Sequence, residues 1–309
     1  MDGFFLINKP KGITSHDVVK KVREWLKIKK VGHTGTLDPN ATGLLIICIS
    51  KATKLVPFLQ DLSKVYWGKL VFGILTESSD EEGKILEERD AFFLQKDKVE
   101  NIFGKFEGRI TQIPPMFSAV HWEGNRLYDL ARKGIKVRVP PREVQIYYLR
   151  LLSFFPGRHP EVEFELHCSK GTYVRSLCSD IGNMCGCGAY QKSLSRLRIG
   201  PFSLREAKKM EEVERKIKEG KIEEILWGLT QALPHLPLLK VKRKAEKLVK
   251  WGVPLYLSHL EEIPPTLEKG DKVRLCNQEE KLLAVAISLQ KGTRFSQDKV
   301  GFKYLRVLA

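Results

Sequence analysis

The chain has 309 residues, a length suited to one large domain and a smaller one. Its 53 Lys and Arg residues exceed its 37 Asp and Glu residues, and the net charge of +16 favours a phosphate-rich partner such as nucleic acid over a generic basic surface. The sequence has neither a run of about eighteen apolar residues nor a charged and then apolar leader, so we expect a soluble, cytoplasmic protein that binds no membrane.

The first predicted elements are a strand over residues 4–7 and, after a turn over residues 8–12, a helix that Thr14 and Ser15 cap. Apolar residues recur at helical spacing as far as Leu26, and basic residues occupy the other positions. These basic residues either solubilise the helix or line a track for phosphates, and the pattern favours neither.

A loop over residues 31–43 follows, and it leads into an apolar run over residues 44–49 that is short enough for a buried strand. The glycines of the loop let a ligand approach the backbone closely. Its one carboxylate is Asp38, which Pro39 keeps away from helical angles. Such a residue is a candidate nucleophile or base, although Asp-Pro is more often a simple turn. A phosphate-binding loop is disfavoured, because the Gly-Lys-Ser/Thr ending of that motif is missing.

The next predicted strand covers residues 64–72, where Lys64 and Tyr66 point to the same face. A tyrosine in a strand is usually a packing residue. Further on, residues 121–150 interleave basic with aromatic residues, among them Arg126 and Arg132, and such a segment can neutralise phosphates and stack bases. The alternative is a surface loop of ordinary charge.

Residues 161–168 alternate between apolar and polar and predict a strand, after which a glycine turn brings Tyr173 and Arg175 onto one face before a helix begins. Residues 206–228 are predicted to be helical, and prolines at positions 234 and 237 mark a linker. Beyond the linker, strand-like runs within residues 238–309 suit a small module resembling a β-barrel.

The strongest signal is a resemblance to the TruB family, the tRNA pseudouridine-55 synthases. It rests on the loop sequence Gly32-His-Thr-Gly-Thr-Leu-Asp38-Pro39 and on the following Ala41-Thr-Gly-Leu-Leu45. Further similar motifs are Lys9-Pro10-x-Gly12-x-Thr14-Ser15, Lys64-x-Tyr66, Gln112-x-Pro114-Pro115 and Gly171-Thr-Tyr173-x-Arg175. One departure is His121, which stands where the family pattern has a lysine.

The resemblance implies an α+β fold, namely a mixed, largely antiparallel β-sheet pseudouridine synthase core with flanking helices, followed by a small C-terminal β-barrel-like PUA domain. The catalytic domain would cover residues 1–232, with an RNA-clamping insertion at about residues 121–150. The PUA-like RNA-binding domain would cover residues 238–309.

The resemblance also implies that the chain isomerises uridine to pseudouridine at position 55 in the T arm of tRNA, on a base flipped out of its stack. Asp38 is the expected nucleophile, attacking either the uracil ring or the sugar, and Tyr66 is expected to stack on the base and move a proton. Burial raises the pKa of a carboxyl group and a bonded guanidinium lowers it, so we expect Arg175 to keep Asp38 ionised. The expected substrate-binding residues are His33, Lys9, Lys64, Tyr173, Leu194, Arg126 and Arg132.

An isomerisation involves no net redox or hydrolytic chemistry, and the sequence has no nucleotide-cofactor motif. The six cysteines lack paired CxxC spacing, so we expect reduced, mostly buried thiols and neither a cofactor nor a metal. We expect a monomer that binds tRNA without an obligate protein partner. One alternative is an RNA-binding module that acts as a tRNA-folding chaperone. The other is the related guide-dependent enzyme that works within ribonucleoproteins, and the lack of lysine-rich tails argues against this second alternative.

Overall fold

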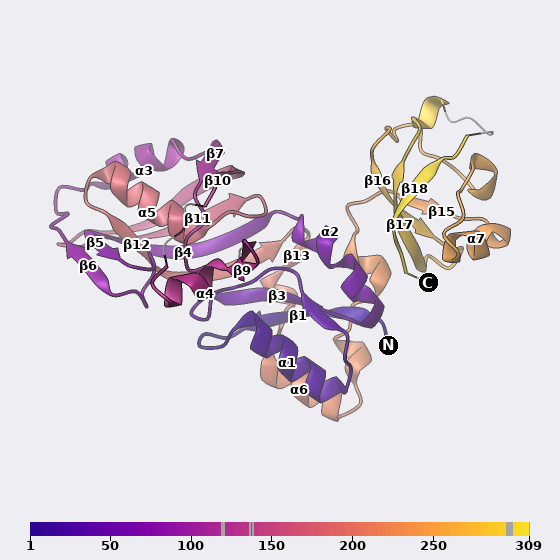
Figure 1. Cartoon of the computed structure of the whole chain (residues 1–309), viewed down its shortest axis with the longest axis horizontal. Helices are drawn as coiled ribbons and strands as arrows, with labels where there is room; N and C mark the ends of the chain where they lie inside the picture. The colour runs from indigo at the N-terminus through magenta and orange to yellow at the C-terminus, as the bar shows by residue number, and fades with distance from the viewer. Residues whose placement is uncertain (119–120, 136, 138, 295–298, 309) are drawn as a thin grey trace.

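The computed structural model describes residues 1–118, 121–135, 137, 139–294 and 299–308, and it gives residues 121, 122, 126 and 132 by their backbone alone. Two bodies of unequal size make up the molecule (Figure 1). The C-terminal sheet lies at one end and the hairpin of β5 (Ile74–Thr76) and β6 (Ile85–Glu88) at the other. Among the described residues, no helix combines the length and the apolar character needed to cross a membrane.

The larger body is built on a ten-stranded sheet. Its strands are β1 (Gly3–Lys9), β2 (Val31–His33), β3 (Thr42–Ile49), β4 (Lys64–Phe72), β7 (Gly108–Gln112), β10 (Arg142–Phe155), β11 (Glu161–Cys168), β12 (Ala189–Ile199), β13 (Phe202–Ser203) and β14 (Lys208–Lys209). The order is β14-β1-β3-β12-β4-β11-β10-β7, with β2 added to β3 and β13 to β12. The β1–β14 and β3–β12 pairs are parallel and the other pairs of the described sheet are antiparallel. The predicted mixed, largely antiparallel sheet is confirmed.

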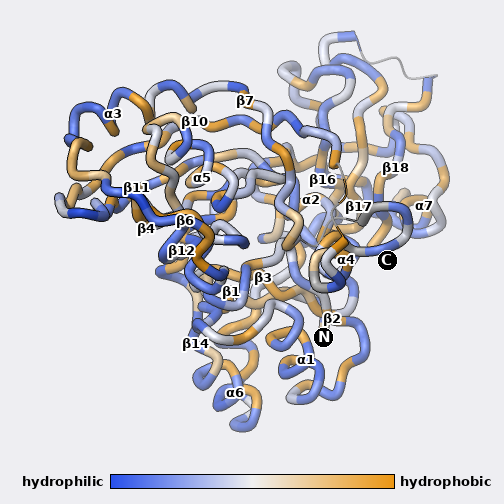
Figure 2. Tube along the Cα trace, turned by 60° about the vertical axis from the view of Figure 1, so that its left-hand side comes forward, coloured by the Kyte–Doolittle hydropathy of each residue, from blue (hydrophilic) through white to orange (hydrophobic). Residues whose placement is uncertain are grey.

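Helices flank the sheet. In the larger body they are α1 (Ser15–Leu26), α2 (Val56–Gln60), α3 (Lys96–Gly104), α4 (Leu127–Arg132), α5 (Val174–Cys185) and α6 (Met210–Lys218). The C-terminal body carries α7 (Glu246–Lys250), which packs with that body's own sheet (Figure 1). Buried residues of α3 and α5 pack with β4, β11 and β12 in one apolar cluster. At the other half of the sheet, α1 and α6 lie side by side and carry both apolar and hydrophilic residues (Figure 2), and their apolar residues pack against β1 and β3.

Local signals explain where the helices begin and end. The Thr14 hydroxyl accepts a hydrogen bond from the Asp17 N–H at 3.0 Å, and the Asp17 carboxylate accepts one from the Thr14 N–H at 2.9 Å. This capping box starts α1 at the predicted place. The helical stretch predicted for residues 206–228 is shorter in the structure, because Gly220 takes a φ of 70° just after α6 and reverses the chain.

The C-terminal body is a four-stranded sheet in the order β15 (Leu238–Lys240), β16 (Lys272–Cys276), β17 (Leu282–Ser288) and β18 (Phe302–Val307). Val273 and Phe302 belong to its own apolar core, whereas Leu282 shares a cluster with Leu6 of β1. Lys54 also donates a hydrogen bond to the Val307 carbonyl at 2.9 Å. A small β module therefore follows the linker, and it packs against the larger body.

Candidate active site

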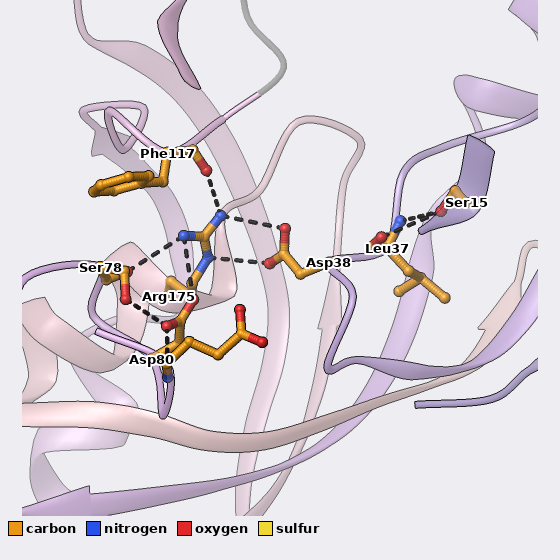
Figure 3. A network of polar contacts seen from close by, with 8 residues as sticks. Ser15, Leu37, Asp38, Ser78, Asp80, Phe117 and Arg175 are labelled. Atoms are coloured by element: carbon orange, nitrogen blue, oxygen red, sulfur yellow. Dashed lines mark hydrogen bonds and ion pairs between the residues drawn. The ribbon is translucent and has the colours of Figure 1, made fainter. Parts of the chain in front are cut away.

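The loop that carries Asp38 is anchored by buried polar groups of the first strand and helix. The Ser15 hydroxyl accepts a hydrogen bond from the Leu37 N–H at 2.9 Å and donates one to the Leu37 carbonyl at 3.2 Å (Figure 3). On the other side of Asp38, the fully buried Lys9 ammonium donates to the Pro39 carbonyl at 3.0 Å. Both neighbours of Asp38 are thus fixed, which sets the position of its backbone.

Arg175, in the first turn of α5, holds this carboxylate with two donors. Its Nε lies 3.0 Å from one oxygen of Asp38, and its Nη2 lies 3.3 Å from the other oxygen (Figure 3). The same guanidinium donates to the carbonyls of Phe117 at 2.7 Å and Ser78 at 3.3 Å. Arg175 therefore joins segments that are far apart in the sequence, and the predicted pairing of Asp38 with Arg175 is present in the structure.

A second carboxylate, Asp80, lies on the opposite side of Arg175, with its oxygen 3.4 Å from Nη1 (Figure 3). Asp80 is itself fixed, because it accepts hydrogen bonds from the Ser78 hydroxyl and from the Glu82 N–H. Sequence reasoning missed this residue. The sequence does show a carboxylate within a tight turn. No local pattern, however, indicates that Arg175 is the cation with which it pairs.

The electrostatics of Asp38 differ from the expectation. Burial raises the pKa of Asp38 above its ordinary value, the Arg175 guanidinium lowers it, and the Asp80 carboxylate raises it. The net direction is upward because burial has the largest effect. Arg175 therefore limits the rise without reversing it, and acid protonates Asp38 more readily than an ordinary aspartate.

The Asp38 carboxylate opens into a cavity of about 730 Å³. Tyr66 of β4 and Leu194 of β12 also line it, as the resemblance implies, together with Tyr173 and Arg175. Tyr66 is only 8% exposed, and burial raises the pKa of its hydroxyl group. The cavity thus combines a carboxylate, an aromatic ring and an apolar side chain in a space large enough for a nucleoside.

Tyr173 is fixed at the start of α5 by a buried glutamine. The Tyr173 N–H donates to Oε1 of Gln112 at 3.0 Å, and Nε2 of Gln112 donates to the Tyr173 carbonyl at 3.2 Å. Gln112 is 1% exposed and belongs to the Gln-x-Pro-Pro motif. The motif therefore has a physical role, because its glutamine connects β7 to the first turn of the helix that presents Arg175.

Lys9 and Lys64 occupy different places from those expected of substrate-binding residues. The Lys9 ammonium is fully buried and also donates to the carbonyls of Pro10 and Ile13. Lys64 is 7% exposed and donates to the carbonyls of two residues that precede β4. Burial lowers the pKa of each lysine to about 8. Both side chains support the backbone around the cavity and neither lines it.

The remaining predicted residues lie away from the cavity wall or outside the described side chains. His33 ends β2, and its Nδ1 accepts a hydrogen bond from the Gly35 N–H at 3.3 Å. Burial lowers the pKa of His33, which favours the neutral ring. Arg126 belongs to β9 (Asn125–Arg126), which pairs with β8 (His121–Trp122), and Arg132 ends α4. The side chains of both arginines lie outside the described residues, as do residues 136 and 138 of the predicted insertion.

Arg196 of β12 is a second residue that sequence reasoning missed. It is 1% exposed and donates to the carbonyls of Leu44 at 2.7 Å and Gly35 at 3.1 Å. Its guanidinium also lies beside the Tyr66 hydroxyl and opposes the upward shift of that pKa. Arg196 thus connects the Asp38 loop with β4, the strand that presents Tyr66. The available sequence signal is the two-residue spacing from Leu194 to Arg196, which places both side chains on the buried face of β12.

Comparison with known proteins identifies the family. Residues 23–174 match the model described as TruB family pseudouridylate synthase (N terminal domain), and residues 175–234 match the tRNA pseudouridylate synthase B C-terminal domain. The chain is 38% identical over 314 residues to the tRNA pseudouridine synthase B of Pelotomaculum thermopropionicum, covering 100% of this chain and 98% of that protein. It is 44% identical over 269 residues to the protein of the same name from Geobacillus thermodenitrificans, covering 84% and 89%.

A solved structure entitled Crystal Structure of a Cbf5-Nop10-Gar1 Complex contains a chain of similar fold. The TM-score is 0.79 at 26% identity, and the alignment covers 99% of this chain and 85% of the other. The similarity extends over the large sheet and the C-terminal body. On the strength of the two family models and of relatives that align over its whole length, this chain belongs to the TruB family of pseudouridylate synthases.

Proposed function

We propose that this protein isomerises uridine to pseudouridine at position 55 in the T arm of tRNA. The observation that carries the proposal is the Asp38 carboxylate, which Arg175 fixes with two donors at the wall of a nucleoside-sized cavity. Relatives named tRNA pseudouridine synthase B support the choice of tRNA, and so does the net charge of +16.

The chemistry needs only groups that the cavity contains. The bond between the sugar C1′ and the uracil N1 breaks, the ring turns, and C1′ bonds to C5, which loses its proton while N1 gains one. Asp38 is the proposed nucleophile, toward either the ring or the sugar carbon. The aromatic face of Tyr66 supports the ring, Leu194 contacts it from β12, and the Tyr66 hydroxyl is the proposed proton carrier.

The target uridine must leave its stack to reach Asp38, at a cost of about a few kcal/mol. Contacts elsewhere on the RNA have to offset this cost. We assign them to the basic insertion at about residues 121–150, including Arg126 and Arg132, and to the C-terminal body, which we propose is a PUA-like RNA-binding domain. His33 and Tyr173 complete the proposed RNA-binding set near the Asp38 loop.

The proposal is tested with an unmodified tRNA transcript and the purified protein alone. We expect one pseudouridine per tRNA, at position 55, and no product on a transcript with cytidine at that position. A bare T-arm stem-loop should also be a substrate, because we propose a cytoplasmic monomer without an obligate protein partner. Modification only after other proteins or a guide RNA are added would favour the guide-dependent class. Binding and refolding of tRNA without any pseudouridine would favour the chaperone alternative.

A further inference from the structure

Among the described residues that line the cavity, two carry a positive charge, Arg142 and Arg175. The Arg175 guanidinium is fully engaged, because Asp38, Asp80 and two backbone carbonyls surround it. The Arg142 side chain, in contrast, is exposed and makes no hydrogen bond or ion pair within the described part of the chain. Arg142 is therefore the cation at this cavity that is left to meet an anionic ligand.

The backbone explains why Arg142 lies at the cavity. It opens β10, directly after the buried Val139 and two prolines, whose rings fix the backbone φ. In the pairing of β10 with β7, Arg142 lies opposite Gln112, and such paired residues point to the same side of a sheet. Gln112 is bonded to the Tyr173 backbone, so Arg142 is directed toward the same turn. Burial raises the pKa of the Tyr173 hydroxyl, and the Arg142 guanidinium nearby opposes this rise.

We propose that Arg142 binds a phosphate that flanks the target uridine after this nucleotide has left its stack. The base and ribose must enter the cavity to reach Asp38, but the RNA chain continues on both sides of them. The flanking phosphates therefore stay at the mouth of the cavity, where an exposed lining residue such as Arg142 lies. A guanidinium suits this ligand, because its paired N–H donors match two oxygens of a phosphodiester.

The contact also offsets an electrostatic cost of the site. A phosphodiester that approaches the cavity is repelled by the Asp38 and Asp80 carboxylates, and Arg175 is already shared between them. A second cation at the mouth compensates this repulsion. Arg142 thus stabilises the extruded nucleotide rather than the stacked one, whose phosphates remain outside the cavity. This inference rests on the proposed function and adds a residue that fixes the extruded nucleotide.

Neutral linkages in the RNA test the contact directly. T-arm stem-loops are prepared with an uncharged methylphosphonate in place of either phosphate that flanks the target, and single-turnover pseudouridine formation is measured. We expect Arg142→Gln to lower the rate on the natural stem-loop about tenfold, as for the loss of a hydrogen bond to a charged group. For the wild type, a methylphosphonate at one of the two positions should cause a similar loss. The same methylphosphonate should cause no further loss for Arg142→Gln, because the two changes remove one contact.

Two variants serve as controls. Arg109→Gln removes an exposed arginine of β7 that does not line the cavity, so it should keep the rate of the wild type and its sensitivity to the methylphosphonate. Arg142→Lys keeps the charge without the paired donors and should recover part of the rate that Arg142→Gln loses.

Two results would overturn the inference. One is a rate for Arg142→Gln within twofold of the wild type, and the other is a full additional loss for this variant from the methylphosphonate at each position. If the wild-type protein made no pseudouridine on any RNA, the proposed function would fail instead. Binding of the same stem-loops to Asp38→Asn, with and without Arg142→Gln, would then still report the phosphate contact, so the two failures are distinguishable.

Discussion

Replacing Arg175 with lysine tests whether the shape of the cation matters as well as its charge. The guanidinium makes five contacts, two with Asp38 and one each with Asp80, Ser78 and Phe117. A lysine ammonium is a single centre and cannot reach both Asp38 oxygens together with the groups on the far side. Arg175→Lys therefore keeps the positive charge but loses the paired donors that hold both oxygens of Asp38.

The expected loss follows from these contacts. A hydrogen bond to a charged group contributes about 1.5–3 kcal/mol, and the value has to be reduced here because the Asp38 side chain is 39% exposed. Loss of the paired donors and of one further contact then amounts to about 2–3 kcal/mol, or roughly a 30- to 150-fold fall in the single-turnover rate. Arg175 also lowers the pKa of Asp38, so weakening it raises that pKa further and moves the acid limb of the rate profile to higher pH.

The assay is single-turnover release of tritium from carbon 5 of uridine in a tRNA transcript, measured from acidic to neutral pH. Arg205→Lys is the matched control, because Arg205 is exposed and lies outside the cavity, and we expect it to behave as the wild type. A rate within threefold of wild type together with an unmoved acid limb for Arg175→Lys would refute the reasoning.

Asp80, Tyr66 and Lys9 each make a contact whose loss has a measurable effect. Asp80→Asn removes a like charge and lowers the pKa of Asp38, so the acid limb should move to lower pH, and a shift to higher pH would contradict this. Tyr66→Phe keeps the ring and should slow single-turnover isomerisation by about 100-fold or more at little-changed tRNA affinity. An unchanged rate would remove the hydroxyl from the mechanism. Lys9→Met leaves three carbonyls without their donor, so the free energy of unfolding measured in urea should fall by about 2–3 kcal/mol, and an unaltered value would be inconsistent with the anchoring role.

Much of the framework was predictable because its signals are local. The capping box before α1 and the short apolar run of β3 fix the elements on either side of the Asp38 loop. The alternation in residues 161–168 predicts β11. The pairing of Asp38 with Arg175 came from the family resemblance, since no local pattern links residues that far apart.

The features that sequence reasoning missed depend on contacts between distant segments. Lys9 was expected to bind the substrate, but its ammonium is buried and donates to backbone carbonyls that include that of the distant Pro39. Asp80 became part of the site because its turn lies against Arg175.

The most direct test of the central claim compares Asp38→Asn with the wild type for pseudouridine formation and tRNA binding. Burial raises the pKa of Asp38, so its ionised form costs folding stability above that pKa, and this cost disappears as the pH falls below the ordinary range of an aspartate. The melting temperature of Asp38→Asn at neutral pH should therefore equal or exceed that of the wild type, with a difference that shrinks on acidification. We expect no pseudouridine from this variant at undiminished tRNA affinity. Pseudouridine formation at a rate near that of the wild type would contradict it.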